Sequence, residues 1–298
     1  MRAFEYVLAR DSGHAVTLLA EHGSSARILA GGTDLLVELK SASHAPNVVI
    51  DISRAADLKG IAITDEGLSI GALVTHAEIM RSAIIREMFP ALADAAHTVG
   101  AVQTRSLGTL GGNLVTGVPS MDSGPTLIAL EARVALTGPG GRRQSPLAEF
   151  FVGPRKTILK PGELLASILI PRKNLGKPTA FLKFGLRKGQ ALALVNVAAS
   201  LRIDSQKQNF FREPRIALGA VAPTIMRALK AEAWLEGRAV TPEAMVEAGR
   251  LAAEEAKPIS DFRASAAYRR DLVAVLTRRA LENACALARA GRAGESKR

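Results

Sequence analysis

The stretch ARILAGGTDLLVELK, from Ala26 to Lys40, limits the possible folds more than any other part of this sequence. An apolar run stops at Gly31 and Gly32, and Thr33-Asp34 then opens an amphipathic segment. Glycine has no Cβ, so the backbone at such a corner can adopt left-handed dihedrals and approach another group closely. The order of strand, bare corner and helix start is typical of a site where main-chain amides hold an anion. A plain tight turn is the alternative that this stretch alone leaves open.

The hydrophobic pattern around this corner predicts a small α/β unit in the first fifty-odd residues. It predicts a helix over 12–23 capped by Ser12, strands over 27–30, 48–52 and 67–71, and helices over 75–88 and 90–98. The beginning of the next segment, 105–136, is rich in Gly, Thr, Ser and Asn and predicts no regular element. A helix over 121–130 and strands over 133–136 and 164–170 are expected after it.

The pattern changes after residue 179. Strands are predicted over 181–184, 193–203 and 215–221, and everything after Met226 has a helical period. Strands followed by a run of helices favour an α+β unit. We place a domain boundary near residue 175, where the segment 173–178 has the composition of a linker. The expected domains are 1–175, with subdomains of about 1–55 and 56–175, and 176–298.

Composition excludes several kinds of site. The single cysteine, Cys285, leaves too few thiolates for an iron–sulfur cluster or a cysteine zinc site, and we expect it to be buried and inert. No metal site is expected from the five histidines, which show no ligand spacing and are interpreted as surface or cap residues: His14, His22, His44, His76 and His97. No apolar run is long enough to form a transmembrane segment, and the N-terminus lacks a signal-peptide core, so we expect a cytoplasmic protein.

The formal net charge of +11 is concentrated in one segment. Between Arg142 and Gln190 there are eleven Lys/Arg and two Asp/Glu. Such a surface could meet nucleic acid, an acidic partner or a phosphorylated ligand. Aromatic residues are only 4% of the chain and do not alternate with the basic ones, which speaks against a stacking platform for single strands.

A second glycine-rich loop strengthens the interpretation of the first. The run from Gly108 to Asn113, GTLGGN, again combines a hydroxyl, two bare positions and an amide. Two such loops could clamp the two phosphates of a dinucleotide. Asp122 follows nine residues later and could accept hydrogen bonds from a ribose diol, or could be a charge favoured at a helix start. Together these residues favour a dinucleotide site over two unrelated turns.

With these motifs in view, the sequence resembles the FAD-binding medium subunits of the molybdenum hydroxylases, the xanthine dehydrogenase and aerobic carbon monoxide dehydrogenase type. AGGTDLL resembles the first flavin loop, and TLGGN with PSMD the second. KPGELLASILIP resembles the end of the FAD domain, and LKFGLRKGQALALVNVAASL, GAVAPTIMRA and DFRASAAYRRDL resemble the C-terminal domain. The implied fold is α+β: a two-subdomain FAD-binding fold of the p-cresol methylhydroxylase/vanillyl-alcohol oxidase type, followed by a domain of a small antiparallel sheet plus helices.

The resemblance also implies the roles of individual residues. The backbone of 28–34 would embrace the FAD pyrophosphate, Asp122 would bind the adenosine end, Leu165 would pack against the cofactor, and Lys183 would reach its polar edge. For Lys183, an ordinary exposed lysine is nearly as good an interpretation. The implied cofactor-binding set, with no catalytic residue and no metal ligand, is Ile28, Leu29, Ala30, Gly31, Gly32, Thr33, Asp34, Val99, Gly100, Thr109, Gly112, Asn113, Asp122, Leu165 and Lys183.

The function implied by the resemblance is electron transfer. The chain would take electrons from the [2Fe-2S] clusters of a small partner subunit and pass them from noncovalent FAD to an external acceptor. A large partner subunit would hold the molybdenum cofactor, in a heterotrimer that is commonly doubled to (αβγ)2. Ala191 stands where family members often carry Asp, and the first loop has no histidine suited to a covalent flavin link.

Two other functions are weighed against this one. The first is a stand-alone FAD-dependent oxidoreductase, which would need acid–base residues facing the flavin that the sequence does not reveal. The second is a non-enzymatic basic module that binds nucleic acid through residues 142–190. The electron-transfer interpretation carries the expectation that nucleic acid is not a partner.

Overall fold

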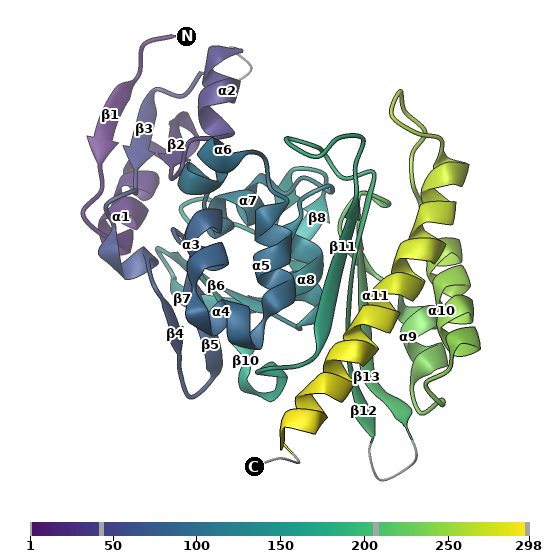
Figure 1. The fold of residues 1–298 in the computed structure, drawn as a ribbon. Coiled ribbons are helices and arrows are strands. Elements are labelled where there is room, and N and C mark those ends of the chain that lie inside the picture. The colour runs from purple at the N-terminus through teal and green to yellow at the C-terminus, as the bar shows by residue number, and fades with distance from the viewer. Residues whose placement is uncertain (1, 42–44, 205–208, 296–298) are drawn as a thin grey trace.

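Three packed units follow one another along the chain, as Figure 1 shows. The computed structural model describes residues 2–41, 45–204 and 209–295. A three-stranded sheet belongs to the N-terminal unit, a five-stranded sheet with several helices forms the middle, and a four-stranded sheet with long helices completes the chain. This combination of parallel and antiparallel sheets confirms the predicted α+β class.

The first unit is the small α/β unit that the sequence predicted. Strands β1 (Glu5–Leu8), β3 (Val48–Asp51) and β2 (Ala26–Leu29) pair in parallel in that order, and α1 (Ser12–His22) and α2 (Leu35–Lys40) connect them. Asp11, not Ser12, caps α1, because its side chain accepts a hydrogen bond from the backbone nitrogen of His14 at 2.7 Å. The sequence analysis missed β1, a short strand that is largely exposed.

The second unit is built on an antiparallel sheet with the order β4-β5-β10-β6-β7. Helices cover one face of it, and the apolar core of the unit lies between them and the sheet. Its strands are β4 (Ile61–Ile63), β5 (Gly67–Gly71), β6 (Arg133–Gly138), β7 (Gly141–Pro146) and β10 (Leu164–Pro171), with a separate hairpin of β8 (Phe151–Gly153) and β9 (Lys156–Thr157). Its helices are α3 (His76–Arg81), α4 (Ala83–Met88), α5 (Pro90–His97), α6 (Val102–Leu107), α7 (Leu110–Thr116) and α8 (Ser123–Ala129).

Two expectations for this unit were wrong. The single helix expected over 75–88 is broken at Ser82, which ends α3 and caps α4 through a hydrogen bond from the nitrogen of Ile85. The glycine-rich segment expected to be irregular contains the end of α6 and all of α7. Thr109 begins α7 by accepting a hydrogen bond from the nitrogen of Gly112 at 3.1 Å, and left-handed Gly117 ends it. The capping residues outweigh the low helix propensity of glycine.

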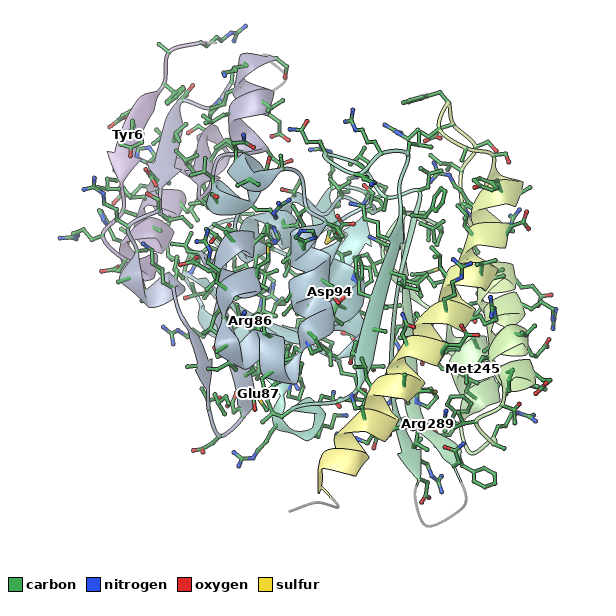
Figure 2. All side chains as sticks on the ribbon, in the orientation of Figure 1. Tyr6, Arg86, Glu87, Asp94, Met245 and Arg289 are labelled. Atoms are coloured by element: carbon green, nitrogen blue, oxygen red, sulfur yellow. The ribbon has the colours of Figure 1, made fainter. Side chains whose placement is uncertain are left out.

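The third unit is an antiparallel sheet of β11 (Thr179–Phe184), β12 (Val195–Asp204), β13 (Phe210–Gly219) and β14 (Met226–Arg227). Helices α9 (Leu229–Leu235), α10 (Pro242–Glu255) and α11 (Ala266–Glu295) follow. Helices α9 and α11 pack on one face of the sheet, and α5 and α8 of the second unit pack on the other. Figure 2 places Asp94 of α5 and Met245 of α10 on the two sides of this sheet. Both faces are therefore buried.

Successive side chains of a strand point to opposite faces of the sheet, so the side chains of this sheet belong to two different cores. Ala198 and its cross-strand neighbours Phe181 and Ala217 join the core of the second unit. Val197 and Ala199, on either side of Ala198, join the core under the C-terminal helices. This sheet thus packs the C-terminal helices against the second unit.

Helix α8 is held in this junction by hydrogen bonds at both ends. All seven of its residues are buried. Asn196 donates to the carbonyl of Met121 at 3.0 Å, Ser200 to that of Ala129 at 2.7 Å, and Asn174 to that of Leu130 at 2.8 Å. Asn174 of the predicted linker segment 173–178 is buried and contributes one of these bonds, so this segment is packed against the second unit.

Glu131, which follows α8, connects the same two units through charge. It pairs with Lys173 at 2.9 Å and Arg215 at 3.2 Å, and it accepts a hydrogen bond from Asn174. Burial by itself raises the pKa of Glu131. Hydrogen bonds from Lys173 and Asn174 and the charge of Arg215 outweigh this and lower it from 4.5 to about 2.

Replacing Glu131 by Gln is expected to lower the free energy of unfolding by about 2 kcal/mol at pH 7. The carboxylate stabilises the fold fully above pH 4.5, and this contribution is lost as the pH falls from 4.5 toward 2. Urea unfolding of both proteins at pH 7, 5 and 3 should therefore show a smaller loss of stability in acid for Glu131→Gln. Equal stability of the two proteins at pH 7 would contradict this prediction.

Candidate functional site

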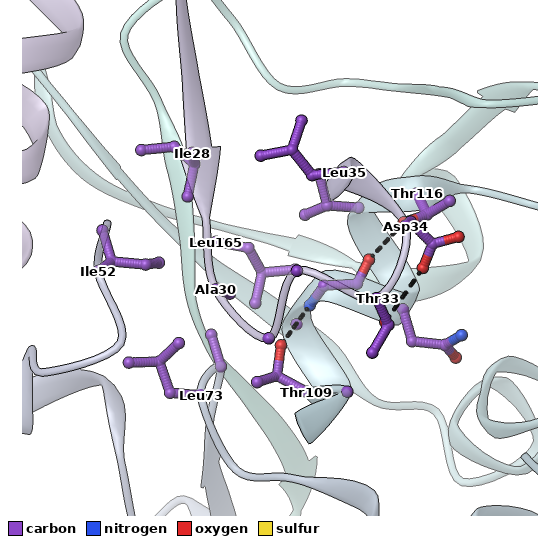
Figure 3. A pocket seen from close by; sticks show the side chains of 18 of the residues that line it. Ile28, Ala30, Thr33, Asp34, Leu35, Ile52, Leu73, Thr109, Thr116 and Leu165 are labelled. Carbon is purple, nitrogen blue, oxygen red and sulfur yellow. Dashed lines mark hydrogen bonds between the residues drawn. The ribbon is translucent and has the colours of Figure 1, made fainter. Parts of the chain in front are cut away.

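A cleft between the first and second units collects most of the residues singled out from the sequence. Figure 3 shows apolar Ile28, Ile52, Leu73 and Leu165 toward one side, and Thr33, Asp34, Thr109 and Thr116 toward the other. The cleft is lined by Ile28, Ala30, Gly31, Gly32, Thr33, Asp34, Leu35, Ile52, Ala72, Leu73, His76, Val99, Thr104, Gly108, Thr109, Gly111, Gly112, Asn113, Val115, Thr116, Leu159, Glu163, Leu164 and Leu165.

The first glycine loop presents unused backbone donors to this cleft. In the described part of the chain, the amide nitrogens of residues 31–34 donate no hydrogen bond. The side chain of Asp34, which precedes α2, makes no capping bond. Residues 31–34 line the cleft, and successive backbone amides without a partner in the chain are free to donate there to a ligand that is rich in acceptor atoms.

The two glycines are required by the protein itself. Gly32 has a φ of +72°, in the left-handed region that glycine adopts without strain. A Cβ on Gly31 would lie 1.9 Å from the carbonyl oxygen of Leu107, so the bare backbone lets the first loop touch the end of α6. The predicted corner between strand and helix is confirmed, and the close approach at Gly31 is to another part of the chain.

The second glycine segment differs from the first. Gly111 and Gly112 lie inside α7, where a Cβ on Gly111 would lie 2.6 Å from the Cβ of Ala72. The amide nitrogens of Leu110, Gly111 and Gly112 already donate to Val74, Ala72 and Thr109 respectively. The expectation of two equivalent loops was therefore wrong in geometry, although both segments face the same cleft. The second glycine segment therefore presents side chains to the cleft, and not unbonded amides.

Two of the residues singled out from the sequence, Asp122 and Lys183, pair with one another just beyond the cleft lining. Lys183 donates to Asp122 at 2.5 Å and to the carbonyl of Thr98 at 3.1 Å, next to the cleft-lining Val99. The side chains of Lys183 and Asp122 are only 8% and 6% exposed, so Lys183 is not an ordinary surface lysine. Asp122 also accepts a hydrogen bond from Asn196, and the carbonyl of Gly100 accepts one from the nitrogen of Gln190.

His76 is the cleft residue that sequence reasoning interpreted wrongly. It was expected at the surface or as a cap, but only 1% of it is exposed. It stands directly after Thr75, which caps α3, and such a position is usually exposed, so the sequence pattern gave no signal for its burial. Burial, together with the charge of Arg105, lowers the pKa of His76 to about 4.

Other kinds of site receive no support from the structure. Among residues 2–41, 45–204 and 209–295, no group of three His, Cys, Asp or Glu is placed to hold a metal ion. His44 lies outside these described residues. Cys285 is buried, as expected, and burial raises its pKa to about 11. Within the same ranges, no helix has both the length and the apolar character needed to cross a membrane.

Eleven of the fifteen residues singled out from the sequence line the cleft, and Leu29, Gly100, Asp122 and Lys183 do not. The sequence analysis missed apolar lining residues contributed by separate elements, such as Ile52, Leu73 and Val115. A single apolar residue in a strand or helix carries no sign of which cavity it borders, so no signal in the sequence could have identified them.

Removing one partner of the Lys183–Asp122 pair is expected to destabilise the protein strongly. Lys183→Met would leave a buried carboxylate unpaired and should lower the free energy of unfolding by about 3 kcal/mol. Adding Asp122→Asn should restore most of this loss, because the charge then disappears together with its partner. Urea unfolding measures both effects, with exposed Lys188→Met as the control. A Lys183→Met variant as stable as the control would contradict the prediction.

Comparison with known families gives two matches that together span most of the chain. Residues 2–173 match the family described as the FAD binding domain in molybdopterin dehydrogenase. Residues 180–284 match the family described as the CO dehydrogenase flavoprotein C-terminal domain. The two matches meet where the second unit passes into the third.

Individual relatives are similar over nearly their whole length. The carbon monoxide dehydrogenase medium chain of Hydrogenophaga pseudoflava is 35% identical over 283 residues, covering 95% of this chain and 97% of that protein. The xanthine dehydrogenase FAD-binding subunit of Escherichia coli O157:H7 is 30% identical over 287 residues, covering 95% and 96%.

Solved structures agree with this relationship. The carbon monoxide dehydrogenase structure from Hydrogenophaga pseudoflava superposes with a TM-score of 0.91 at 35% identity, covering 96% of this chain and 98% of the matched one. Quinoline 2-oxidoreductase from Pseudomonas putida 86 gives 0.89 at 29% identity, covering 96% and 98%. The resemblance seen in the sequence motifs is thereby confirmed: the chain belongs to the family of FAD-binding subunits of molybdopterin dehydrogenases, which are oxidoreductases.

Proposed function

We propose that this chain binds FAD noncovalently in the cleft and transfers electrons within a multisubunit molybdenum-containing dehydrogenase. The observation that carries the proposal is the run of four unused amides at residues 31–34 beside a largely apolar cleft, in a member of this family. A dinucleotide needs donors for its pyrophosphate and apolar walls for its rings, and the residues present fit both needs.

The residues on the two walls of the cleft are proposed to bind different parts of FAD. The backbone of 28–34 is proposed to hold the pyrophosphate, with Thr109, Gly112 and Asn113 on the facing side. Leu165 and its apolar neighbours are proposed to pack against the cofactor, with Val99 and Gly100 near the flavin.

Asp122 and Lys183 are proposed to act on the cofactor together. Their side chains touch, so they belong at the same end of it. The bond from Lys183 to the carbonyl of Thr98, beside Val99, favours the flavin end for both residues. This changes the expectation that Asp122 serves the adenosine end.

Bound FAD would supply a group that accepts electrons singly and releases them singly or in pairs, as a junction between one-electron clusters and a final acceptor requires. The chain's own residues bind and orient that group. Its one cysteine cannot hold iron–sulfur clusters, so we propose a small [2Fe-2S] subunit as electron donor and a large molybdenum-cofactor subunit as the site of substrate oxidation. The proposed assembly is (αβγ)2 in the cytoplasm, with NAD, a quinone or oxygen as acceptor.

The basic segment gives less support to the nucleic-acid alternative than its composition indicated. Lys177 and Lys183 are buried, and Arg143 and Arg155 pair with Glu163 and Glu38 at 2.7 and 2.8 Å. Two of its eleven charges are therefore buried and two more are paired with acidic side chains, so these four do not add to an unpaired basic surface.

The purified chain is expected to retain close to one FAD per polypeptide after incubation with FAD and desalting. The visible spectrum gives the ratio of flavin to protein, and chromatography of the released cofactor identifies it. An isolated subunit can lose its flavin, so the same measurement is made on the chain co-expressed with its partner subunits. Absence of FAD from both preparations would overturn the proposal.

Ala30→Phe is expected to weaken FAD binding by roughly tenfold or more, because a benzyl group in the occupied cleft creates a clash that costs about 1–3 kcal/mol. Ala30 lines the cleft, and Val37 on α2 is 63% exposed and does not line it, so Val37→Phe is the matched control. Titration by flavin fluorescence gives the Kd of each variant, and thermal unfolding without FAD checks the fold. Unchanged affinity in a folded Ala30→Phe would place the cofactor elsewhere.

A further inference from the structure

The side-chain amide of Asn113 is held in one orientation by a buried serine. Asn113 lies on α7 and lines the cleft, whereas Ser123, the first residue of α8, is fully buried and does not line it. The hydroxyl of Ser123 donates to Oδ1 of Asn113 at 2.6 Å, its one hydrogen bond within the part of the chain that the structure describes. If the amide were reversed, the buried hydroxyl would have no acceptor for its hydrogen, so this contact fixes which atom is the oxygen.

This orientation turns the amide nitrogen of Asn113 toward the cleft. The oxygen and the nitrogen of a carboxamide lie on opposite sides of its planar group, and the oxygen faces Ser123 in the interior. Among the described residues, Nδ2 of Asn113 has no hydrogen-bond partner, and it is not one of the unpartnered side-chain atoms that are closed off from solvent. Its two N–H groups are therefore accessible where Asn113 borders the cleft.

Asn113 supplies donors on a wall where most other donors are already used. The backbone nitrogens of residues 110–113 all donate within the chain, and the hydroxyl of Thr116 donates to the carbonyl of Gly112 at 2.8 Å. The phosphates, ribityl chain and ribose of a dinucleotide are rich in oxygen atoms that accept hydrogen bonds. An amide that presented its oxygen to them would repel them, so the orientation of the Asn113 amide decides whether this wall attracts the ligand.

We infer that Ser123 is a positioning residue for the cofactor. It fixes the amide of Asn113 with the nitrogen toward the cleft, where that nitrogen donates to an oxygen atom of the bound dinucleotide. This inference rests on the proposed FAD function of the cleft. Ser123 belongs to neither glycine segment and follows Asp122, so the start of α8 holds both Asn113 and Lys183 in place.

A positioning role and a packing role for Ser123 lead to different expectations. A hydroxyl that only stabilises the fold changes the FAD-free protein, and any effect it has on FAD binding does not depend on residue 113. A hydroxyl that acts by orienting Asn113 loses its effect on FAD binding once the amide of Asn113 has been removed. A double-mutant cycle measures this dependence.

The cycle uses Ser123→Ala, Asn113→Ala and the double variant, with FAD Kd measured by flavin fluorescence titration and stability by urea unfolding without FAD. Asn113→Ala is expected to raise the Kd about tenfold, because one hydrogen bond to FAD is lost. Ser123→Ala is expected to raise it about three- to tenfold, because the amide is then free to turn. The double variant is expected to bind FAD as Asn113→Ala does.

Asn113→Asp tests the direction of the amide. A carboxylate keeps an oxygen that can accept from Ser123, and it places a second, negatively charged oxygen where the amide nitrogen stood. Because that charge repels the phosphates of FAD, Asn113→Asp is expected to bind FAD more weakly than Asn113→Ala. This comparison does not require any change at Ser123.

Ser200→Ala is the matched control. Ser200 is also fully buried, its hydroxyl donates to the carbonyl of Ala129 at the other end of α8 at 2.7 Å, and it does not line the cleft. Its replacement should lower the urea midpoint and leave the Kd for FAD unchanged. The control separates the loss of any buried hydroxyl beside α8 from the loss of the one that orients Asn113.

Three results would overturn the inference: an unchanged Kd in folded Ser123→Ala, an equal effect of Ser123→Ala with and without Asn113, or tight FAD binding by Asn113→Asp. If Ser123→Ala does not fold, Ser123→Cys gives the same comparison, because a thiol is a weak donor. Failure of the original protein to bind FAD is a separate outcome, since it would contradict the proposed function of the cleft before any variant is compared.

Discussion

The architecture depends on hydrogen bonds to the backbone carbonyl groups of one short, fully buried helix, α8. The carbonyl groups at the ends of α8 cannot reach water, and a buried carbonyl without a partner is costly. Asn174, Ser200 and Asn196 supply the missing donors from the third unit and from the segment leading into it. The C-terminal sheet therefore needs polar side chains on a face that is otherwise apolar, and these bonds fix how the second and third units lie against one another.

The cleft on the other side of the second unit lies between two walls that carry different kinds of hydrogen-bonding group. One wall brings unused backbone amides, and the facing wall brings side chains from α7, whose own amides are already bonded. The contact of Gly31 with the carbonyl of Leu107 holds the two walls close together. Hydrogen-bonding groups of two types thus surround one volume, and such an arrangement limits the ordering that binding of a ligand would require.

The ion pairs that join the second and third units are arranged in a consistent way. Lys183 with Asp122, and Glu131 with Lys173 and Arg215, each join residues that are distant in sequence. Such pairs add little net stability compared with apolar packing, but a misplaced partner is strongly penalised. They favour one relative arrangement of the units, including the position of Lys183 beside the wall of the cleft.

The sequence by itself determined the elements with a strong local cause. The apolar strand, the glycine corner and the following helix of residues 26–40 were readable because periodicity and conformational freedom act over a few residues. The family motifs likewise identified most of the cleft. Only the tertiary structure decided that the second glycine segment is helical, that Lys183 pairs with Asp122, and that His76 is buried with an unpartnered nitrogen. Those outcomes depend on contacts between residues far apart in the chain. Such contacts produce no periodic pattern in the sequence.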